Sequence, residues 1–147
     1  MIRSPLTAEL FVSDVCDADV DAAVHARRVA SLCHTMHSSI VGYLHDLVED
    51  YPHVAETLRQ ELIAGGHEHL FASILLLTRT KEQTYADYIE AIAASGDVVA
   101  IEVKIADLCD HLCYGCPTSL VPRYLKALDV LHRQCARQNV LDVEQKR

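Results

Sequence analysis

The stretch GYLHDLVEDYP, residues 42–52, mixes aliphatic side chains with one histidine and three carboxylates: His45, Asp46, Glu49 and Asp50. The aliphatic side chains recur at helical spacing and predict that one face of a helix packs against a core. The carboxylates lie on adjacent turns, where like charges repel, although all three can face one cavity. A divalent cation would neutralise them, with a neutral imidazole and carboxylate oxygens as ligands.

Outward from this stretch, apolar periodicity predicts an all-α fold: a compact single-domain bundle of about six to seven helices spanning residues 1–147. The helices are expected at residues 18–36, 38–50, 54–64, 67–78, 84–95, 97–113 and 119–139. Ser38 or Ser39 is expected to cap the second helix, and Thr84 with Asp87 is a capping pair for the fifth.

Residues 97–106, DVVAIEVKIA, have enough β-branched content to be read as a strand. A helix is the preferred interpretation, because the chain offers no partner strand and a lone strand is not stable.

Composition limits the classes of partner. The net charge is −8 and the sequence has no basic stripe, which argues against a nucleic-acid polymer. No stretch approaches the roughly 18 apolar residues of a membrane span, and residues 1–14 lack the apolar region of a signal peptide. With six cysteines, the expectation is a cytoplasmic protein with free thiols.

Two further residues are candidates to complete a metal site. His25 shares a helical face with aliphatic residues, an unusual place for a polar ring without a partner. Asp107 follows a strongly apolar run, where an unpaired carboxylate would be costly.

The order His25, His45–Asp46, Asp107 resembles the H…HD…D signature of the HD-domain phosphohydrolases, which are all-helical, metal-dependent enzymes. Within that superfamily, three segments are similar to the (p)ppGpp hydrolase domain of RelA/SpoT homologues, the stringent-response enzymes: LHDLVED (44–50), LLTRTKEQTYADYIEAI (76–92) and VKIADLCDHL (103–112). The resemblance covers roughly residues 20–130.

The resemblance implies that His25, His45, Asp46 and Asp107 hold a divalent metal ion, with Mn²⁺ the first choice and Fe, Zn, Mg or Co as alternatives. It implies that Glu49 and Asp50 position and activate the attacking water. The candidate substrate contacts are Lys104, Arg79, Lys81 and Tyr85.

Two segments depart from the RelA/SpoT pattern. Residues 14–25 are acidic, where that group carries a basic, glycine-containing loop, and His111 stands where the group usually has an asparagine. These departures bear on the substrate and leave the metal ligands in place.

Several residues also have a purely structural interpretation. Glu49 and Asp50 can be a solvated helix end, Lys104 can pair with Glu102 or Asp107, and Tyr85 can pack in the core. His34 and His37 are spaced to chelate a metal, although an exposed helix face explains them equally well. His67 and His69 are two apart and do not share a helical face. Cys113 and Cys116 form a single CxxC pair, which is too few ligands for a structural zinc.

The sequence therefore predicts a metal-dependent hydrolase of phosphate ester or pyrophosphate bonds in a small nucleotide, (p)ppGpp foremost. The alternatives are another HD nucleotide phosphatase, such as a 5′-nucleotidase, and a module that binds nucleotide without hydrolysis. The sequence leaves open whether the protein is a monomer or a homo-oligomer.

Overall fold

The computed structural model describes residues 1–17 and 19–145, with side chains described as far as residue 136. Residues 18 and 146–147, which the predicted helix 18–36 and the predicted domain include, lie outside the described residues. Within the described ranges the chain has no strand and forms nine α-helices and two 3₁₀ turns: α1 (Pro5–Cys16), α2 (Val20–Leu32), α3 (Met36–Leu44), α4 (Leu47–Asp50), η1 (Pro52–Val54), α5 (Ala55–Gly65), α6 (Leu70–Leu77), α7 (Tyr85–Ser95), α8 (Val98–Tyr114), η2 (Thr118–Leu120) and α9 (Val121–Gln145).

The predicted all-α class is confirmed, and residues 97–106 are helical as expected, within α8. None of the helices in the described ranges is both long and apolar enough to cross a membrane.

Helix α1 was not predicted. It begins with a capping box in which Ser4 and Thr7 exchange side-chain and backbone hydrogen bonds, and Pro5 occupies the first turn. Both signals are present in the sequence. The apolar residues of this segment do not mark a single buried face, however, since Leu6 and Leu10 are exposed.

The predicted helix over 38–50 is divided into α3 and α4, and its cap is also different. Thr35, rather than Ser38 or Ser39, caps α3 and accepts a hydrogen bond from the backbone of Ser38. The predicted cap at Thr84 is confirmed, since its hydroxyl accepts from the backbone N–H of Asp87 at 3.1 Å.

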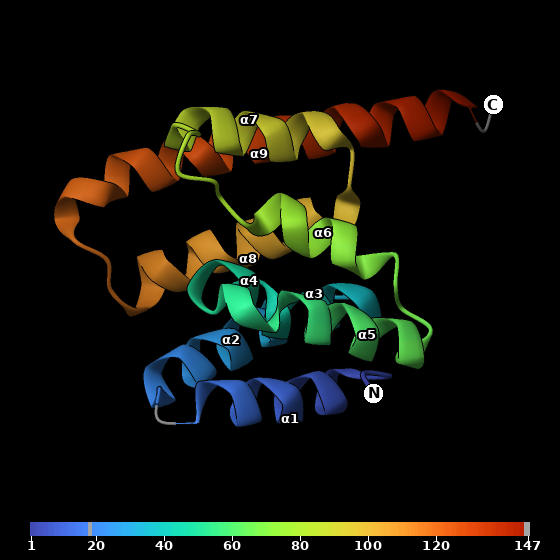
Figure 1. Cartoon of the computed structure of the whole chain (residues 1–147). Helices are drawn as coiled ribbons and strands as arrows, with labels where there is room; N and C mark the ends of the chain where they lie inside the picture. Colours follow the sequence, from blue (N-terminus) through green and yellow to red (C-terminus); the bar gives the residue numbers. More distant parts are fainter. Residues whose placement is uncertain (18, 146–147) are drawn as a thin grey trace.

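Helix α8 crosses the middle of the molecule, with α1–α3 on one side and the α7–α9 pair on the other (Figure 1). It packs against α2, α3, α6, α7 and α9. Its buried side chains are mostly aliphatic, but Asp107 and Asp110 are buried among them, 3% and 1% exposed.

The approach of α2 to α3 depends on Gly42. A Cβ atom at this position would lie 2.9 Å from Cα of Ala30 and 3.3 Å from Sγ of Cys33. A glycine therefore lets the two helices pack with their backbones close together. This packing places α2, the α3–α4 junction and α8 around one point.

Candidate metal centre

The break between α3 and α4 falls at His45 and Asp46. α3 ends at Leu44, and α4 begins at Leu47, with the backbone N–H of Asp50 donating to the carbonyl of Asp46 at 2.9 Å. Adjacent residues on a continuous helix do not face each other. At this turn they do, and Nε2 of His45 lies 3.1 Å from Oδ2 of Asp46.

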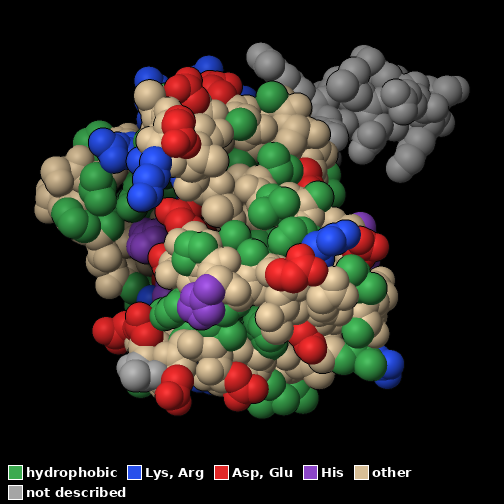
Figure 2. All heavy atoms as spheres, viewed as in Figure 1, with side chains coloured by type: hydrophobic (Ala, Val, Ile, Leu, Met, Phe, Trp, Pro, Cys, Tyr) green, Lys and Arg blue, Asp and Glu red, His purple; other side chains and the backbone are tan. Residues whose placement is uncertain are grey.

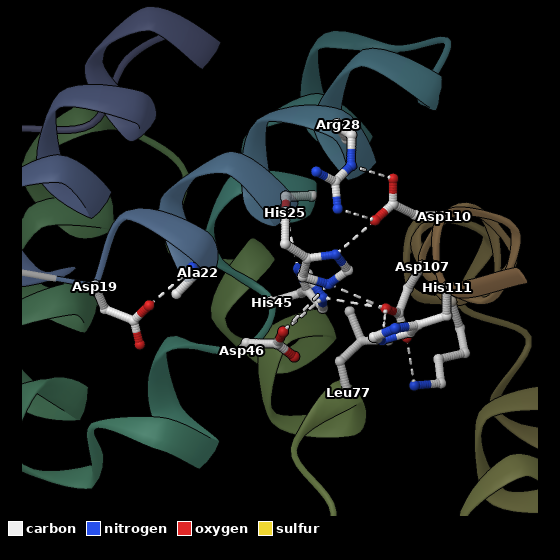
Figure 3. Close-up of polar contacts among 12 residues, drawn as sticks. Asp19, Ala22, His25, Arg28, His45, Asp46, Leu77, Asp107, Asp110 and His111 are labelled. Atoms are coloured by element: carbon white, nitrogen blue, oxygen red, sulfur yellow. Dashed lines mark hydrogen bonds and ion pairs between the residues drawn. The ribbon is translucent and has the colours of Figure 1, made fainter. Parts of the chain in front are cut away.

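The structure brings together all four side chains predicted to hold a metal (Figure 3). Nε2 of His25 lies 3.2 Å from Oδ1 of Asp107 and 3.5 Å from Oδ2 of Asp46. Nε2 of His45 lies 3.7 Å from the same Asp107 oxygen. The four residues come from α2, the α3–α4 junction and α8, so the tertiary fold makes the cluster.

Three of the converging atoms are buried and make no hydrogen bond within the part of the chain that the structure describes: His25 Nε2, His45 Nε2 and Asp107 Oδ1. Buried polar atoms in proteins rarely lack a partner, and a bound ion can serve as that partner. Two imidazole nitrogens and two carboxylate oxygens form a donor set that suits a divalent transition metal. The residues therefore fit the cation that the sequence predicted.

The other ring nitrogens fix the orientation of both imidazoles. Nδ1 of His45 donates to the carbonyl oxygen of Gly42 at 2.9 Å, and Nδ1 of His25 lies 2.8 Å from Oδ2 of Asp110. With the proton on Nδ1, the lone pair of each ring is on Nε2 and faces the centre.

Asp110 and Arg28 were missed by the sequence analysis. Arg28 donates two hydrogen bonds to Asp110, at 2.7 and 2.9 Å, and so holds the carboxylate that orients His25. The signal was helical spacing: Arg28 lies one turn after His25 and Asp110 one turn after Asp107.

His111 also faces the centre. Its Nε2 lies 3.1 Å from Oδ1 of Asp107, and its ring centroid is 4.8 Å from that of His25. The sequence analysis treated His111 only as a departure from the RelA/SpoT pattern. The geometry makes it a third imidazole beside the four predicted ligands, and His25, Asp107 and His111 could themselves hold an ion.

The charges of the centre are strongly coupled. Burial alone would lower the pKa of His25, but Asp107 and Asp46 raise it to about 9. Burial opposes charge on His45 as well, yet Asp46 and Asp107 hold its pKa well above the ordinary value. In the protein without metal these imidazoles therefore carry protons that a cation would have to replace.

Lys104 is buried beside the centre. Its Nζ atom lies 2.7 Å from Oδ2 of Asp107 and 5.1 Å from the centroid of the Tyr88 ring. Despite burial, which opposes the charges, Lys104 holds the pKa of Asp107 well below its usual range. Glu102 and Asp107 were the two candidate ion-pair partners of Lys104. Lys104 pairs with Asp107, whereas Glu102 contacts His34.

The predicted catalytic carboxylates point in different directions. Asp50 and Asp46 line one small cavity beneath α1 and α2, and burial, followed by the charge of Asp46, raises the pKa of Asp50. Glu49 is not among the residues lining that cavity; it accepts a hydrogen bond from the backbone N–H of Arg79 at 2.9 Å. Asp46 and Asp50 therefore share one cavity, and none of His25, His45 and Asp107 lines it.

The predicted substrate contacts other than Lys104 lie on the segment from α6 to α7. Arg79 and Lys81 are exposed, and Tyr85 is partly buried at the start of α7. The Tyr85 hydroxyl is buried without a hydrogen-bond partner among the described residues. Its ring packs beside Tyr124 and lines a groove of about 550 Å³ between α7 and α9, which Arg123 and Lys126 also line.

Comparison with known proteins adds no relative: no protein-family model matches the chain, and no curated protein matches its sequence significantly.

Proposed function

We propose that this protein is a metal-dependent phosphohydrolase of the HD-domain type that acts on a small nucleotide, with (p)ppGpp the first substrate to test. The observation that carries the proposal is the convergence of His25, His45, Asp46 and Asp107 around atoms that are buried and lack hydrogen bonds. Without a bound cation, these imidazoles and carboxylates pair with one another across the centre, and a cation would give all of them a common partner.

The four residues would hold the cation, and Mn²⁺ suits their mixture of imidazole and carboxylate donors. When bound, such a cation lowers the pKa of a coordinated water and stabilises negative charge on a phosphoryl oxygen. His111 would add a third imidazole on the more exposed side of the centre, where its side chain is 40% exposed.

The chain's own residues supply the remaining roles. Asp50 shares a cavity with Asp46, and its raised pKa suits a group that accepts or donates a proton. Lys104 keeps positive charge beside Asp107, and Glu49 anchors the backbone of Arg79, so that it can position the segment that carries the predicted substrate contacts.

The surface supports a small substrate. Acidic side chains are scattered over the face shown in Figure 2, and no continuous basic stripe crosses it. Together with the net charge of −8, this supports a small substrate over a nucleic-acid polymer. All six cysteines are free thiols, which supports a cytoplasmic location as part of the proposal.

The test combines elemental analysis of the purified protein with a panel of nucleotides scored for released phosphate and pyrophosphate. We expect Asp46→Ala to lose the metal and the hydrolysis together, and Asp50→Asn to keep the metal and lose turnover. The matched control is Asp129→Asn, which changes an exposed carboxylate of α9. Hydrolysis that survives in Asp46→Ala would remove the proposal.

A nucleotide-binding module without hydrolysis is the second candidate, and the N-terminus of α2 favours it. Here Asp19 caps the helix through the backbone N–H of Ala22 at 3.0 Å, in the acidic segment that replaces the basic loop of RelA/SpoT homologues. Nucleotide binding by the metal-loaded protein, with no product after long incubation, would establish this alternative. Release of phosphate rather than pyrophosphate would instead favour a 5′-nucleotidase-like activity.

A further inference from the structure

Three histidines outside the metal centre also converge. His37 lies on the first turn of α3, whereas His67 and His69 lie in the segment between α5 and α6. One ring nitrogen from each residue lies within 4.8 Å of the other two. The ring centroid of His37 is 5.4 Å from that of His67 and 5.0 Å from that of His69.

Sequence spacing drew attention to a different pair, His34 and His37, as possible chelators. His34 and His37 share a helical spacing, but His34 lies before α3 and its Nδ1 is 3.0 Å from the Glu102 carboxylate. His67 and His69 would point apart on a helix, but residues 67–69 precede α6 and are not helical. His34 and His37, for which an exposed helix face was an equal explanation, do not come together. The expectation that His67 and His69 point apart was wrong, because it depended on a helix that begins only after them.

The segment that carries His67 and His69 is fixed by its backbone. Gly66 adopts the left-handed conformation (φ +81°) that ends α5 and turns the chain, and a side chain there would be strained. The N–H of His67 then donates to the carbonyl of Leu62 at 2.8 Å, and the carbonyl of His67 accepts from the N–H of Leu70 at 2.9 Å. Both imidazoles are thus attached to an ordered turn, which favours a pre-organised site.

The surroundings leave a lone pair available on His67 and favour the neutral form of His37. Nε2 of His67 donates to the carbonyl oxygen of Arg3 at 3.4 Å, and in this tautomer the lone pair is on Nδ1. Burial, and then the neighbouring His69 and His67, lower the pKa of His37. Glu68, which stands between the other two histidines in the sequence, pairs with Arg59 at 3.0 Å.

We propose that His37, His67 and His69 form a second metal site, which binds Zn²⁺ and connects the start of α3 to the turn between α5 and α6. Three imidazoles with an open fourth position form a known tetrahedral arrangement for zinc, and water can fill that position, because His69 is exposed. An all-imidazole donor set favours Zn²⁺ over Mn²⁺ or Mg²⁺, which prefer oxygen ligands. The site is independent of the proposed hydrolase, and the two centres would select different metals.

The test is zinc stoichiometry of the full chain, stripped of metal and titrated with Zn²⁺ in competition with a chromophoric chelator. We expect His69→Ala to bind one Zn²⁺ per chain fewer than the wild type. The matched control is His34→Ala, which removes the neighbouring exposed histidine and should leave zinc binding unchanged. Asp46→Ala should lose the metal of the other centre and retain this zinc.

Two further measurements test the zinc site even if His69→Ala folds poorly. His69→Gln preserves a polar side chain at the same exposed position and should lose the same zinc. Zinc should also shift the imidazole nitrogen resonances of His37, His67 and His69 in the NMR spectrum of the unaltered chain. Equal zinc uptake by wild type and His69→Ala, or equal loss in His34→Ala, would overturn the site.

Discussion

Nδ1 of His25 lies 2.8 Å from Oδ2 of Asp110, a carboxylate that is 1% exposed and is also bound by Arg28. This contact decides which ring nitrogen of His25 faces the candidate metal centre. A carboxylate in this position orients the imidazole and raises its basicity as a ligand. Asp110 is therefore a positioning residue for the centre, although it does not face the other ligands.

Asp110→Asn should weaken Mn²⁺ binding about 10- to 100-fold, the usual effect of losing such a partner. The amide can present an N–H to the ring and favour the tautomer whose lone pair lies on the wrong nitrogen. The measurement is Mn²⁺ affinity by titration calorimetry, with the exposed Asp129→Asn variant as control. Unchanged affinity in Asp110→Asn would contradict the role assigned to this contact.

Lys104→Met tests how much the buried ion pair between Lys104 and Asp107 stabilises the protein. Lys104 and Asp107 form a contact of 2.7 Å, and their side chains are only 12% and 5% exposed. Removing one partner of a buried ion pair costs about 3–5 kcal/mol when the other charge is left unpaired. The charged imidazoles of His25 and His45 beside Asp107 place the expected loss at the lower end of this range. We expect the free energy of unfolding in urea to fall by this order in the metal-free protein.

Saturating Mn²⁺ should reduce that loss, because a cation would compensate the Asp107 carboxylate when Lys104 is absent. Lys126→Met, on the exposed surface of α9, is the control and should unfold at the wild-type urea concentration. If the loss is the same with and without Mn²⁺, the cation does not reach Asp107.

The helical class and the four side chains that converge at the candidate centre could be singled out from the sequence, because each is marked by a local feature. Apolar spacing marks helices, and a histidine or carboxylate within an apolar run indicates a buried polar site. The division of the helix at His45 and Asp46 could not be predicted this way, since the pattern of Leu44, Leu47 and Val48 continues through it. The break is set by the tertiary packing that brings α2 and α8 to the same point.

The residues that support the ligands were harder to recognise for a different reason. Asp110 and Arg28 are each inconspicuous in sequence, and their roles exist only because α2 lies against α8. The three-histidine cluster has the same origin, since a turn after α5 meets the start of α3. Contacts between distant segments determine these features. Spacing within one helix shows only that Arg28 and Asp110 each lie one turn after a predicted ligand.

Cys33 provides a test of burial where α2 ends beside α3. Burial, and then the charge of Glu102, raise the pKa of its thiol to about 12. At pH 8 the thiolate fraction should be about 1000-fold smaller than for a thiol with the ordinary pKa of 9.0. Iodoacetamide should therefore modify Cys33 far more slowly in the folded protein than in urea.

The measurement is the rate of Cys33 alkylation by mass spectrometry, and the exposed Cys113 serves as the control that reacts in the folded state. Raising the pH should accelerate modification of folded Cys33 steadily up to about 12, since the thiolate is the reactive form. Equal rates for Cys33 in the folded and unfolded chains would mean that the α2–α3 contact is open in solution.

Tyr85 and Tyr88 give a paired test of whether the Tyr85 hydroxyl is free to bind a substrate. The Tyr85 hydroxyl is buried without a partner among the described residues, whereas the Tyr88 hydroxyl donates to the carbonyl of Leu77. Tyr85→Phe should therefore leave the free energy of unfolding within about 0.5 kcal/mol of the wild type. Tyr88→Phe should lower it by about 1 kcal/mol, because a hydrogen bond is lost and the Leu77 carbonyl is left unpaired.

If the free hydroxyl of Tyr85 binds substrate, Tyr85→Phe should also raise KM about 2- to 10-fold, the equivalent of one neutral hydrogen bond, with kcat nearly unchanged. The measurement is steady-state kinetics on whichever nucleotide of the panel is hydrolysed, together with urea unfolding of both variants. A KM equal to that of the wild type on this nucleotide would exclude a substrate contact through the hydroxyl. A large loss of stability in Tyr85→Phe would instead show that its hydroxyl has a structural partner.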